Sequence, residues 1–361
     1  MNDANELISF IASMSGEGNL RVEENLGEGY VRLRVSEAER RQAKHDIQHV
    51  EDIVIEMLRN ARDAGADKVY LATTKEDGVR TLVFLDNGSG VPRDMQERIF
   101  DARVTSKLES MKMDRWGVHG RGMALFSIKQ NTDEARVVAS DVDLGSVFKV
   151  SVATDRLGER ADQSSWPQAV KDEDGHYVCA RGPHNIIRAA CEFALEELRA
   201  CDVYLGSPSE IAATLHAQAS SRLDASRLLF IDDEAELPVV DRLGLASDAE
   251  DFIRICSGLG LEMSERTAHR ILAGQIKPVR GVTARLLRER DSSSHASVPV
   301  DLAKDRRGLR IAKDDMAQFS RAVERDFNDL ASRYYLNLCG DPKIRVSRDR
   351  ITVTFDLAKE E

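Results

Sequence analysis

Apolar residues recur every three to four positions over residues 50–66, a spacing that predicts an amphipathic helix packed on a core. Glu56, Asn60 and Asp63 follow the same period, so their side chains lie along one stripe of that helix. Taken alone, such a stripe fits a solvated helix face with incidental polar residues. Whether these three residues have a catalytic or binding role therefore depends on motifs elsewhere in the sequence.

Alternating apolar positions predict strands before and after this helix. The expected strands cover 29–36, 68–74, 81–87, 135–140 and 146–152. A helix is expected after Pro92, a loop over 103–116 and a further helix from about 122 to 130. Beyond these, the expected elements are an irregular connection over 155–182, helices over 184–200 and 208–219, a linker over 291–301, a helix over 314–337 and a strand pair over 343–357.

Composition limits the classes of protein that fit. A chain of 361 residues with 42% hydrophobic and 31% charged residues indicates two or three globular domains. There is no apolar run of membrane-spanning length and no secretory signal at the N-terminus, so we expect a cytoplasmic protein without a membrane partner. The five scattered cysteines and eight histidines show no metal-binding spacing. A net charge of −11 argues against a surface that binds nucleic acid as a whole, but it allows a local basic patch.

Three glycine-containing segments accompany the polar stripe. DNGSG, residues 86–90, follows an apolar strand; alone it would read as a hairpin turn, but the PRDM that follows favours a turn into a helix. GVHGRGMAL, residues 117–125, lies where a loop meets a helix, a position at which backbone N–H groups and the helix dipole suit phosphate. The third is Gly145–Ser146, at the start of the last strand.

Together these segments predict a nucleotide site with a division of labour. Asp86 would accept a hydrogen bond from the exocyclic amine of adenine, and the 117–122 segment would bind the phosphates. Asn60 would offer an oxygen to Mg²⁺, which prefers oxygen ligands. Glu56, one helical turn away, would orient or deprotonate a water that attacks the terminal phosphate.

The order of motifs ExxxNxxDA, DNGxG, TSK, GxxGxG and GS resembles the ATPase family of DNA gyrase, the heat-shock chaperone, histidine kinases and MutL, which share the Bergerat fold. NARDAGA and TSK look most like MutL, and GVHGRGMAL looks more like gyrase or topoisomerase VI. The resemblance covers about residues 45–155. It implies an α+β fold, a Bergerat-type α/β sandwich with a mixed sheet and helices on one face, followed by a mainly helical C-terminal region.

The resemblance also implies roles for residues. Glu56 matches the general base and Asn60 the magnesium ligand. Residues 103–116 would form a lid over the nucleotide. The residues that match positions binding ATP are Asn60, Asp63, Asp86, Gly88, Gly90, Lys107, Gly117, Gly120, Arg121, Gly122 and Ser146.

Three differences from other ATP-using proteins bear on the mechanism. In the topoisomerase and MutL branches a strand-rich second domain supplies a lysine to the terminal phosphate, and no such lysine is identified in the helical C-terminal half. His45 and His49 lie close to Glu56 along the chain, whereas a phosphoacceptor histidine sits on a separate helix, so surface histidines are the better interpretation. The P-loop pattern GxxxxGK[ST] is absent.

A second motif lies in the C-terminal half. SERTAHRILAGQIKP, residues 264–278, resembles the recognition helix and following turn of repressor-type helix-turn-helix domains, although the turn before it fits poorly. Arg266, Arg270 and Lys277 belong to a cluster of seven cations over residues 266–290 that contains one acid, Glu289. The cluster fits equally a DNA phosphate-binding patch and an ordinary solvated basic face.

Two functions follow from these patterns. The first is a Mg²⁺-dependent ATPase whose bound ATP closes a lid, and with it a homodimer, and signals to a DNA or protein partner through residues 246–361. The second is an ATP-sensing DNA-binding regulator without significant turnover; a protein kinase lacks a positive signal. The expected domains are an N-terminal segment (1–25), the ATP-binding domain (26–155), a connection and helical region (156–245), the helix-turn-helix-like module (246–290) and a linker, helix and strand pair (291–361).

Overall fold

The computed structural model describes residues 22–106, 112–119, 122–223, 233–287, 313–331, 336–340, 342–346 and 351–359. Lys107, Gly120 and Arg121, three of the candidate site residues, lie outside them. The chain divides into two compact units, Met1–Arg288 and Glu289–Glu361. None of the helices in the described part of the chain is long and apolar enough to span a bilayer.

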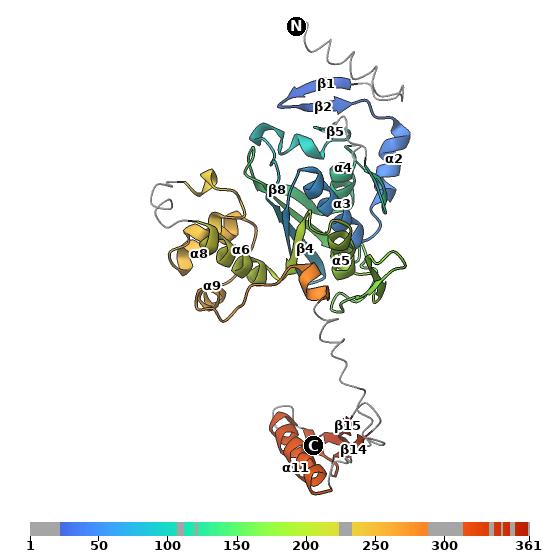
Figure 1. Ribbon diagram of the computed structural model, residues 1–361, viewed down its shortest axis with the longest axis vertical. Coiled ribbons are helices and arrows are strands. Elements are labelled where there is room, and N and C mark those ends of the chain that lie inside the picture. The colour runs from blue at the N-terminus through green and yellow to red at the C-terminus, as the bar shows by residue number, and fades with distance from the viewer. Residues whose placement is uncertain are drawn as a thin grey trace. The chain divides into compact units, whose positions relative to one another are not determined.

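A five-stranded mixed sheet forms the centre of the first unit (Figure 1). Its strands, in spatial order, are β12 (Asp202–Gly206), β3 (Lys68–Glu76), β4 (Val79–Asp86), β9 (Ser146–Ala153) and β8 (Glu134–Ser140). Neighbours are antiparallel, except that β12 runs parallel to β3. The register places Asp86, the last residue of β4, directly opposite Ser146, the first residue of β9.

Alternating side chains on the strands separate two hydrophobic cores. On β3, Val69 and Leu71 face one core, and Tyr70 and Ala72 face the other. The first core is covered by α3 (Val50–Asp63), α4 (Ala124–Asn131) and α5 (Ile186–Glu196). The second is covered by α6 (Pro208–Arg222), α8 (Ala249–Gly258) and α9 (Glu265–Leu272), on the opposite side of the sheet (Figure 1). Since both faces are covered, β4 is buried along most of its length.

The predicted α+β class with a mixed sheet is confirmed, and so are the helix of the polar stripe and the strands on either side of it. Helix α6, expected in the region 156–245, and helices α8 and α9, expected in the module 246–290, all pack on the second face of the same sheet. The sequence did not predict β12, nor the hairpin of β10 (Gln168–Lys171) and β11 (Tyr177–Arg181) within the expected irregular connection.

Two expectations around the candidate lid were wrong. After Pro92 the chain forms two short 3-10 helices, η1 (Arg93–Met95) and η2 (Arg98–Phe100), in place of one continuous helix, and extended backbone at Pro92 and Asp101 bounds this segment. The expected loop over 103–116 contains β5 (Val104–Thr105) and β6 (Lys112–Asp114), which pairs with β7 (Gly117–His119).

A smaller sheet and several short elements complete the first unit. Strands β1 (Val22–Gly27), β2 (Tyr30–Leu33) and β5 form a three-stranded sheet. Helix α2 (Glu37–Asp46) begins with a capping box in which Ser36 and Glu39 satisfy each other's backbone N–H groups. The turns η3 (Glu234–Glu236) and η4 (Arg242–Leu245) precede α8.

The second unit contains one described helix and two strand pairs. Helix α11 spans Lys313–Ala331, shorter than the predicted helix over 314–337 because residues 336–338 form strand β13. Strand β13 (Leu336–Leu338) pairs with β16 (Leu357–Lys359), and β14 (Lys343–Val346) pairs with β15 (Ile351–Thr354), the predicted strand pair. Phe327 of α11 stacks on Phe355, with ring centroids 4.1 Å apart.

Candidate functional site

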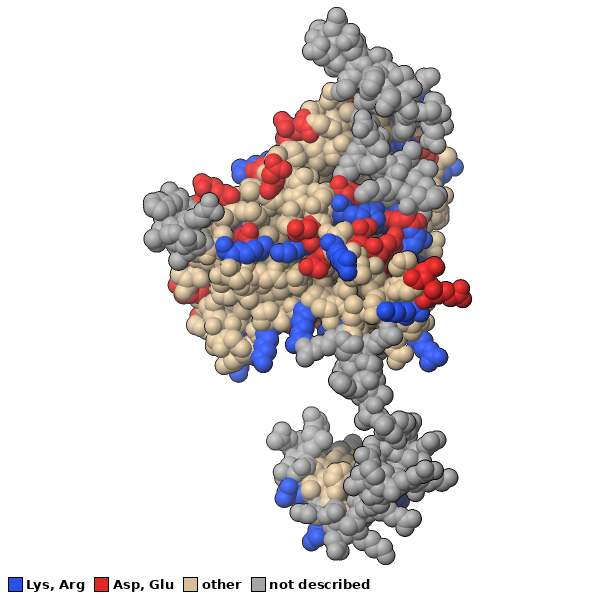
Figure 2. All heavy atoms as spheres, viewed as in Figure 1, with Lys and Arg blue, Asp and Glu red and all other residues tan. Residues whose placement is uncertain are grey.

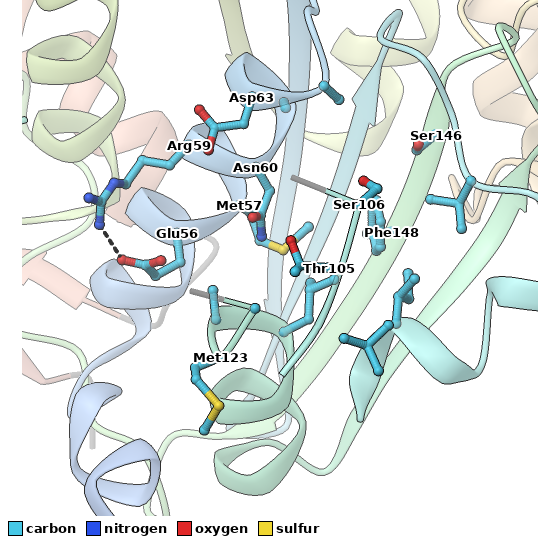
Figure 3. Close-up of a pocket in the computed structure, with 18 of the residues that line it drawn as sticks. Glu56, Met57, Arg59, Asn60, Asp63, Thr105, Ser106, Met123, Ser146 and Phe148 are labelled. Carbon is cyan, nitrogen blue, oxygen red and sulfur yellow. Dashed lines mark hydrogen bonds and ion pairs between the residues drawn. The ribbon is translucent and has the colours of Figure 1, made fainter. Parts of the chain in front are cut away.

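A cavity of about 490 Å³ lies between α3, the ends of β4 and β9, β5 and the start of α4 (Figure 3). Glu56, Asn60 and Asp63 of the polar stripe all line it, together with Asp86, Gly90, Gly122 and Ser146 from the glycine-containing segments. Four separate parts of the sequence are therefore brought to one cavity. Gly88 lies beside it, where an added Cβ would be 2.8 Å from the Cβ of Ala64.

Asn60 lines the cavity, and its side-chain amide nitrogen lacks a hydrogen-bond partner among the described residues. Its side chain projects from α3 toward Thr105 and Ser106 (Figure 3). The amide Nδ2 is buried and has no hydrogen-bond partner among the described residues. A buried polar group without a partner costs roughly 1–3 kcal/mol, so a bound ligand that satisfies this amide recovers free energy. Because an amide carries an oxygen and a nitrogen, Asn60 fits either a hydrogen-bonding ligand or a hard cation.

The floor of the cavity is polar and closely packed. The side chain of Asp86 is buried in it, and its Oδ1 accepts a hydrogen bond of 2.8 Å from the backbone N–H of Gly88. Beside it, the Ser140 hydroxyl donates to the carbonyl of Gly145 and lies 3.3 Å from the Ser146 hydroxyl. A buried carboxylate flanked by small residues can accept a hydrogen bond from a flat polar ring.

Apolar side chains form the walls above this floor. They are Met57, Phe84, Val91, Ile99, Val104 and Phe148. An apolar slot with one buried acceptor at its base is suited to a heteroaromatic ring such as a purine.

The opposite end of the cavity is formed by hydroxyls and a helix start. Thr105, Ser106 and residues 122–125 line it. Helix α4 begins at Ala124 without a side-chain cap, so its first backbone N–H groups and the positive end of its dipole lie at the cavity edge. Tyr30 also lines this end; burial raises its pKa, and a hydrogen bond with Ser106 opposes that rise. This end suits an anion.

Gly117 begins strand β7, so part of the expected phosphate loop is paired backbone rather than open loop. Gly122 is held differently: its carbonyl accepts a hydrogen bond of 2.8 Å from the backbone N–H of Arg103. This bond fixes the start of α4 against the strand that carries Thr105.

A buried network of charges, not predicted from the sequence, contacts Glu56 through Arg59. Arg59, whose side chain is only 3% exposed, donates to Glu56 at 2.7 Å and makes two hydrogen bonds, of 2.9 and 3.0 Å, to the carboxylate of Asp114. Arg62 donates to Asp114, Asp63 and Glu197. Burial alone would lower the pKa of Arg62, but those three carboxylates together raise it above its usual value. The i, i+3 spacing of Glu56 and Arg59 was the only signal visible in the sequence.

The second motif forms α9, which packs with α8 on the other face of the sheet. Ala268 and Ile271 bury one side of α9, and Ser264 caps its start by accepting a hydrogen bond from the N–H of Thr267. Arg266, Arg270 and Lys277 are exposed. A shallow groove is lined by Glu265, Arg266, His269, Arg270, Ala273 and Gln275. Arg285, from the same cationic cluster, instead stacks on Trp166 at 3.9 Å.

The helix, strands and glycine-containing segments that surround the cavity fall largely in one segment that matches a known family. Residues 47–140 match the family described as histidine kinase-, DNA gyrase B- and HSP90-like ATPases, and this match supports an ATP-binding ATPase domain in this part of the chain. The resemblance predicted from the motifs is confirmed.

Among individual proteins, the chain is similar to DNA mismatch repair protein MutL of Staphylococcus aureus, strains Newman, JH1 and Mu3. Each is 28% identical over 136 residues, which are 35% of this chain and 20% of MutL. The chain therefore spans about a fifth of the length of these relatives.

Proposed function

We propose that the chain binds ATP with Mg²⁺ in the cavity beside α3 and hydrolyses it. The observation that supports this proposal best is that Glu56 and Asn60, one turn apart on α3, line the same cavity as the buried Asp86. Asp86 would bind the adenine amine at the floor, with Ser146 beside it. Asn60 would supply an oxygen to Mg²⁺, which would neutralise charge on the phosphates and hold them in place.

The phosphates would lie at the end formed by Thr105, Ser106 and the start of α4. Gly117 and Gly122 belong to this proposed phosphate site, as do Lys107, Gly120 and Arg121 outside the described residues. Asp63, whose carboxylate accepts a hydrogen bond from Arg62, would support the metal face of α3. Glu56 would orient or deprotonate the attacking water.

The decisive variant is Glu56→Ala. Loss of a general base slows a reaction by about 10²- to 10⁴-fold, so turnover measured by phosphate release should fall by that factor. Binding of a non-hydrolysable ATP analogue, measured by calorimetry, should stay within a few-fold of the unchanged protein. Glu37→Ala, an exposed acid in the first turn of α2, serves as the matched control and should leave both quantities unchanged. Undiminished turnover in Glu56→Ala would remove Glu56 from this role.

ATP binding is further proposed to close residues 103–116 over the nucleotide, to bring two chains together and to signal to a partner through residues 246–361. Support comes from the resemblance to MutL over the ATP-binding part alone. Light scattering with and without a non-hydrolysable analogue tests the dimer, and an unchanged mass would argue against it.

A second candidate function, an ATP-sensing regulator that binds DNA without significant turnover, is favoured by the exposed face of α9. Arg266, His269, Arg270 and Ala273 follow the i, i+3, i+4, i+7 spacing of one helix face, and all four are exposed. No acid of the described residues lies within ion-pair distance of Arg266 or Arg270. Lys and Arg side chains also project from the edge of the first unit where α9 lies (Figure 2).

Salt dependence of binding to duplex DNA tests this candidate. Affinity should fall steeply as salt rises, and the double variant Arg266→Ala/Arg270→Ala should reduce the slope of log K against log salt by about 2. Arg254→Ala is the matched control, since Arg254 is an exposed arginine on neighbouring α8 that is already paired with Glu234. Binding that does not change with salt, or no binding, counts against a phosphate-contacting surface. Turnover of ATP by the unchanged protein counts against a pure sensor.

A further inference from the structure

Asp114 connects the β6–β7 hairpin to helix α3 by hydrogen bonds between charged groups. Its two oxygens accept parallel hydrogen bonds from Nε and Nη2 of Arg59, and a third bond of 3.1 Å comes from Arg62. The side chains of Asp114 and Arg59 are 5% and 3% exposed. Asp114 also accepts from the backbone N–H of Trp116, so the carboxylate holds the hairpin turn as well.

The same guanidinium reaches Glu56. Arg59 uses its remaining terminal nitrogen, Nη1, to donate to Glu56 Oε1 at 2.7 Å. In Figure 3 the carboxylate of Glu56 is turned toward Arg59, whereas Asn60 projects toward Thr105 and Ser106. Because the guanidinium is planar, fixing two of its nitrogens on Asp114 fixes the direction of the third. Asp114 and Glu56 therefore bind different nitrogens of one guanidinium, which connects the two carboxylates.

Stability does not account for this arrangement. Burying an ion pair costs several kcal/mol of desolvation per ion, and an apolar replacement is often as stable. What a planar, bidentate pair supplies is a fixed geometry. The arrangement connects the β6–β7 hairpin to Glu56, the residue of the polar stripe that is proposed to act on water.

We propose that Asp114 is a positioning residue for Glu56, acting through the bidentate guanidinium of Arg59. The position of the β6–β7 hairpin thereby determines whether Glu56 is aligned for turnover. This inference rests on the proposed function, because it concerns the same site and the same base.

A double-mutant cycle on turnover tests the inference. Misplacing a catalytic group by about 1 Å can cost roughly 100-fold, so Asp114→Asn should lower kcat by about 10- to 100-fold while KM for ATP stays within a few-fold. In a Glu56→Ala background the same substitution should lower kcat no further, because its target is already absent. Glu159→Gln is the matched control: it also removes the acid of a buried arginine pair, with Arg80, at the far end of β4, and should leave kcat unchanged.

The outcomes separate this inference from the proposed function. No turnover by the unchanged protein would overturn the proposed function, and the inference with it. Full turnover in Glu56→Ala would remove Glu56 from the role of base and so overturn the inference, while ATP hydrolysis itself would stand. If Asp114→Asn leaves kcat unchanged, or lowers kcat equally with and without Glu56, the inference fails while the proposed function stands. Should Asp114→Asn not fold, Arg59→Lys replaces it: lysine keeps the charge but loses the bidentate geometry, so kcat should fall, again only when Glu56 is present.

Discussion

At the scale of single residues, Gly90 lines the cavity at a position where a side chain would collide with backbone. Gly90 has φ +72°, a left-handed conformation, and a Cβ at this position would lie 1.8 Å from the carbonyl oxygen of Asp141. The contact is with backbone, which cannot rotate away as a side chain can. The glycine is therefore required both by conformation and by the close approach of the loop after β8 to the floor of the cavity.

Gly90→Ala should therefore lower the unfolding free energy of the first unit by more than the cost of a left-handed backbone alone, because the new Cβ would also collide with Asp141. Gly78→Ala is the matched control: Gly78 has a similar φ, +78°, but open space where the Cβ would be. The control should lose roughly 1–2 kcal/mol of unfolding free energy, and Gly90→Ala should lose clearly more. Urea denaturation measures both. Equal losses would mean that the loop moves aside at little cost, so the floor would not be rigid.

Also at this scale, several residues that line the cavity could be proposed from the sequence because their signal is local. Glu56 and Asn60 are four residues apart, and Asp86 directly follows an apolar strand. Arg59 and Asp114 could not be paired in advance, since they are 55 positions apart and only the folded chain brings them together. Local spacing thus revealed the residues expected to contact ATP, but not the residue that positions one of them.

At the scale of elements, long periodic segments were predicted well and short or distant ones were not. Helix α3 and strands β3, β4, β8 and β9 carry strong periods of their own. Strand β12 has five residues, lies between two helices, and joins the sheet by pairing with β3, which is more than 120 positions earlier. A short parallel edge strand has little pattern of its own, so its place depends on the neighbouring strand.

This placement of β12 changes how the elements around the site are related. Helix α5, just before β12, packs on α3 in the same core. Glu197, at the end of α5, accepts a hydrogen bond from Arg62 of α3. Helix α3 is thus held by the sheet on which it packs and by a charged contact from the end of α5. This support reaches α3 from residues beyond 155, outside the segment that resembles the ATPase family.

At the scale of the whole molecule, charge is distributed unevenly. The chain carries −11 overall, yet exposed cations gather on α9 and the segment after it. The proposed ATP site is on one face of the central sheet and α9 is on the other, so the sheet itself separates them. A nucleotide signal to α9 would therefore have to pass through strands β3, β4 and β9, whose side chains contribute to both cores.

The division into two units leads to a prediction for thermal unfolding. The proposed ATP site lies wholly within Met1–Arg288, so a ligand there should stabilise that unit and not Glu289–Glu361. A ligand at 100 times its Kd contributes about 2.7 kcal/mol. Scanning calorimetry of the full chain should show the transition of the larger unit rising by roughly 5 °C or more with Mg²⁺ and a non-hydrolysable ATP analogue. The transition of the smaller unit should stay where it is.

Asp86→Asn provides the control, because it keeps the shape of the side chain but loses the charge of the acceptor proposed to bind adenine. A hydrogen bond to a charged group contributes about 1.5–3 kcal/mol, so the variant should bind the analogue roughly 10- to 100-fold more weakly and lose most of the shift. Removing Mg²⁺ with a chelator should reduce the shift in the unchanged protein. An equal rise in both transitions, or an undiminished rise in Asp86→Asn, would place the bound nucleotide somewhere other than the cavity beside α3.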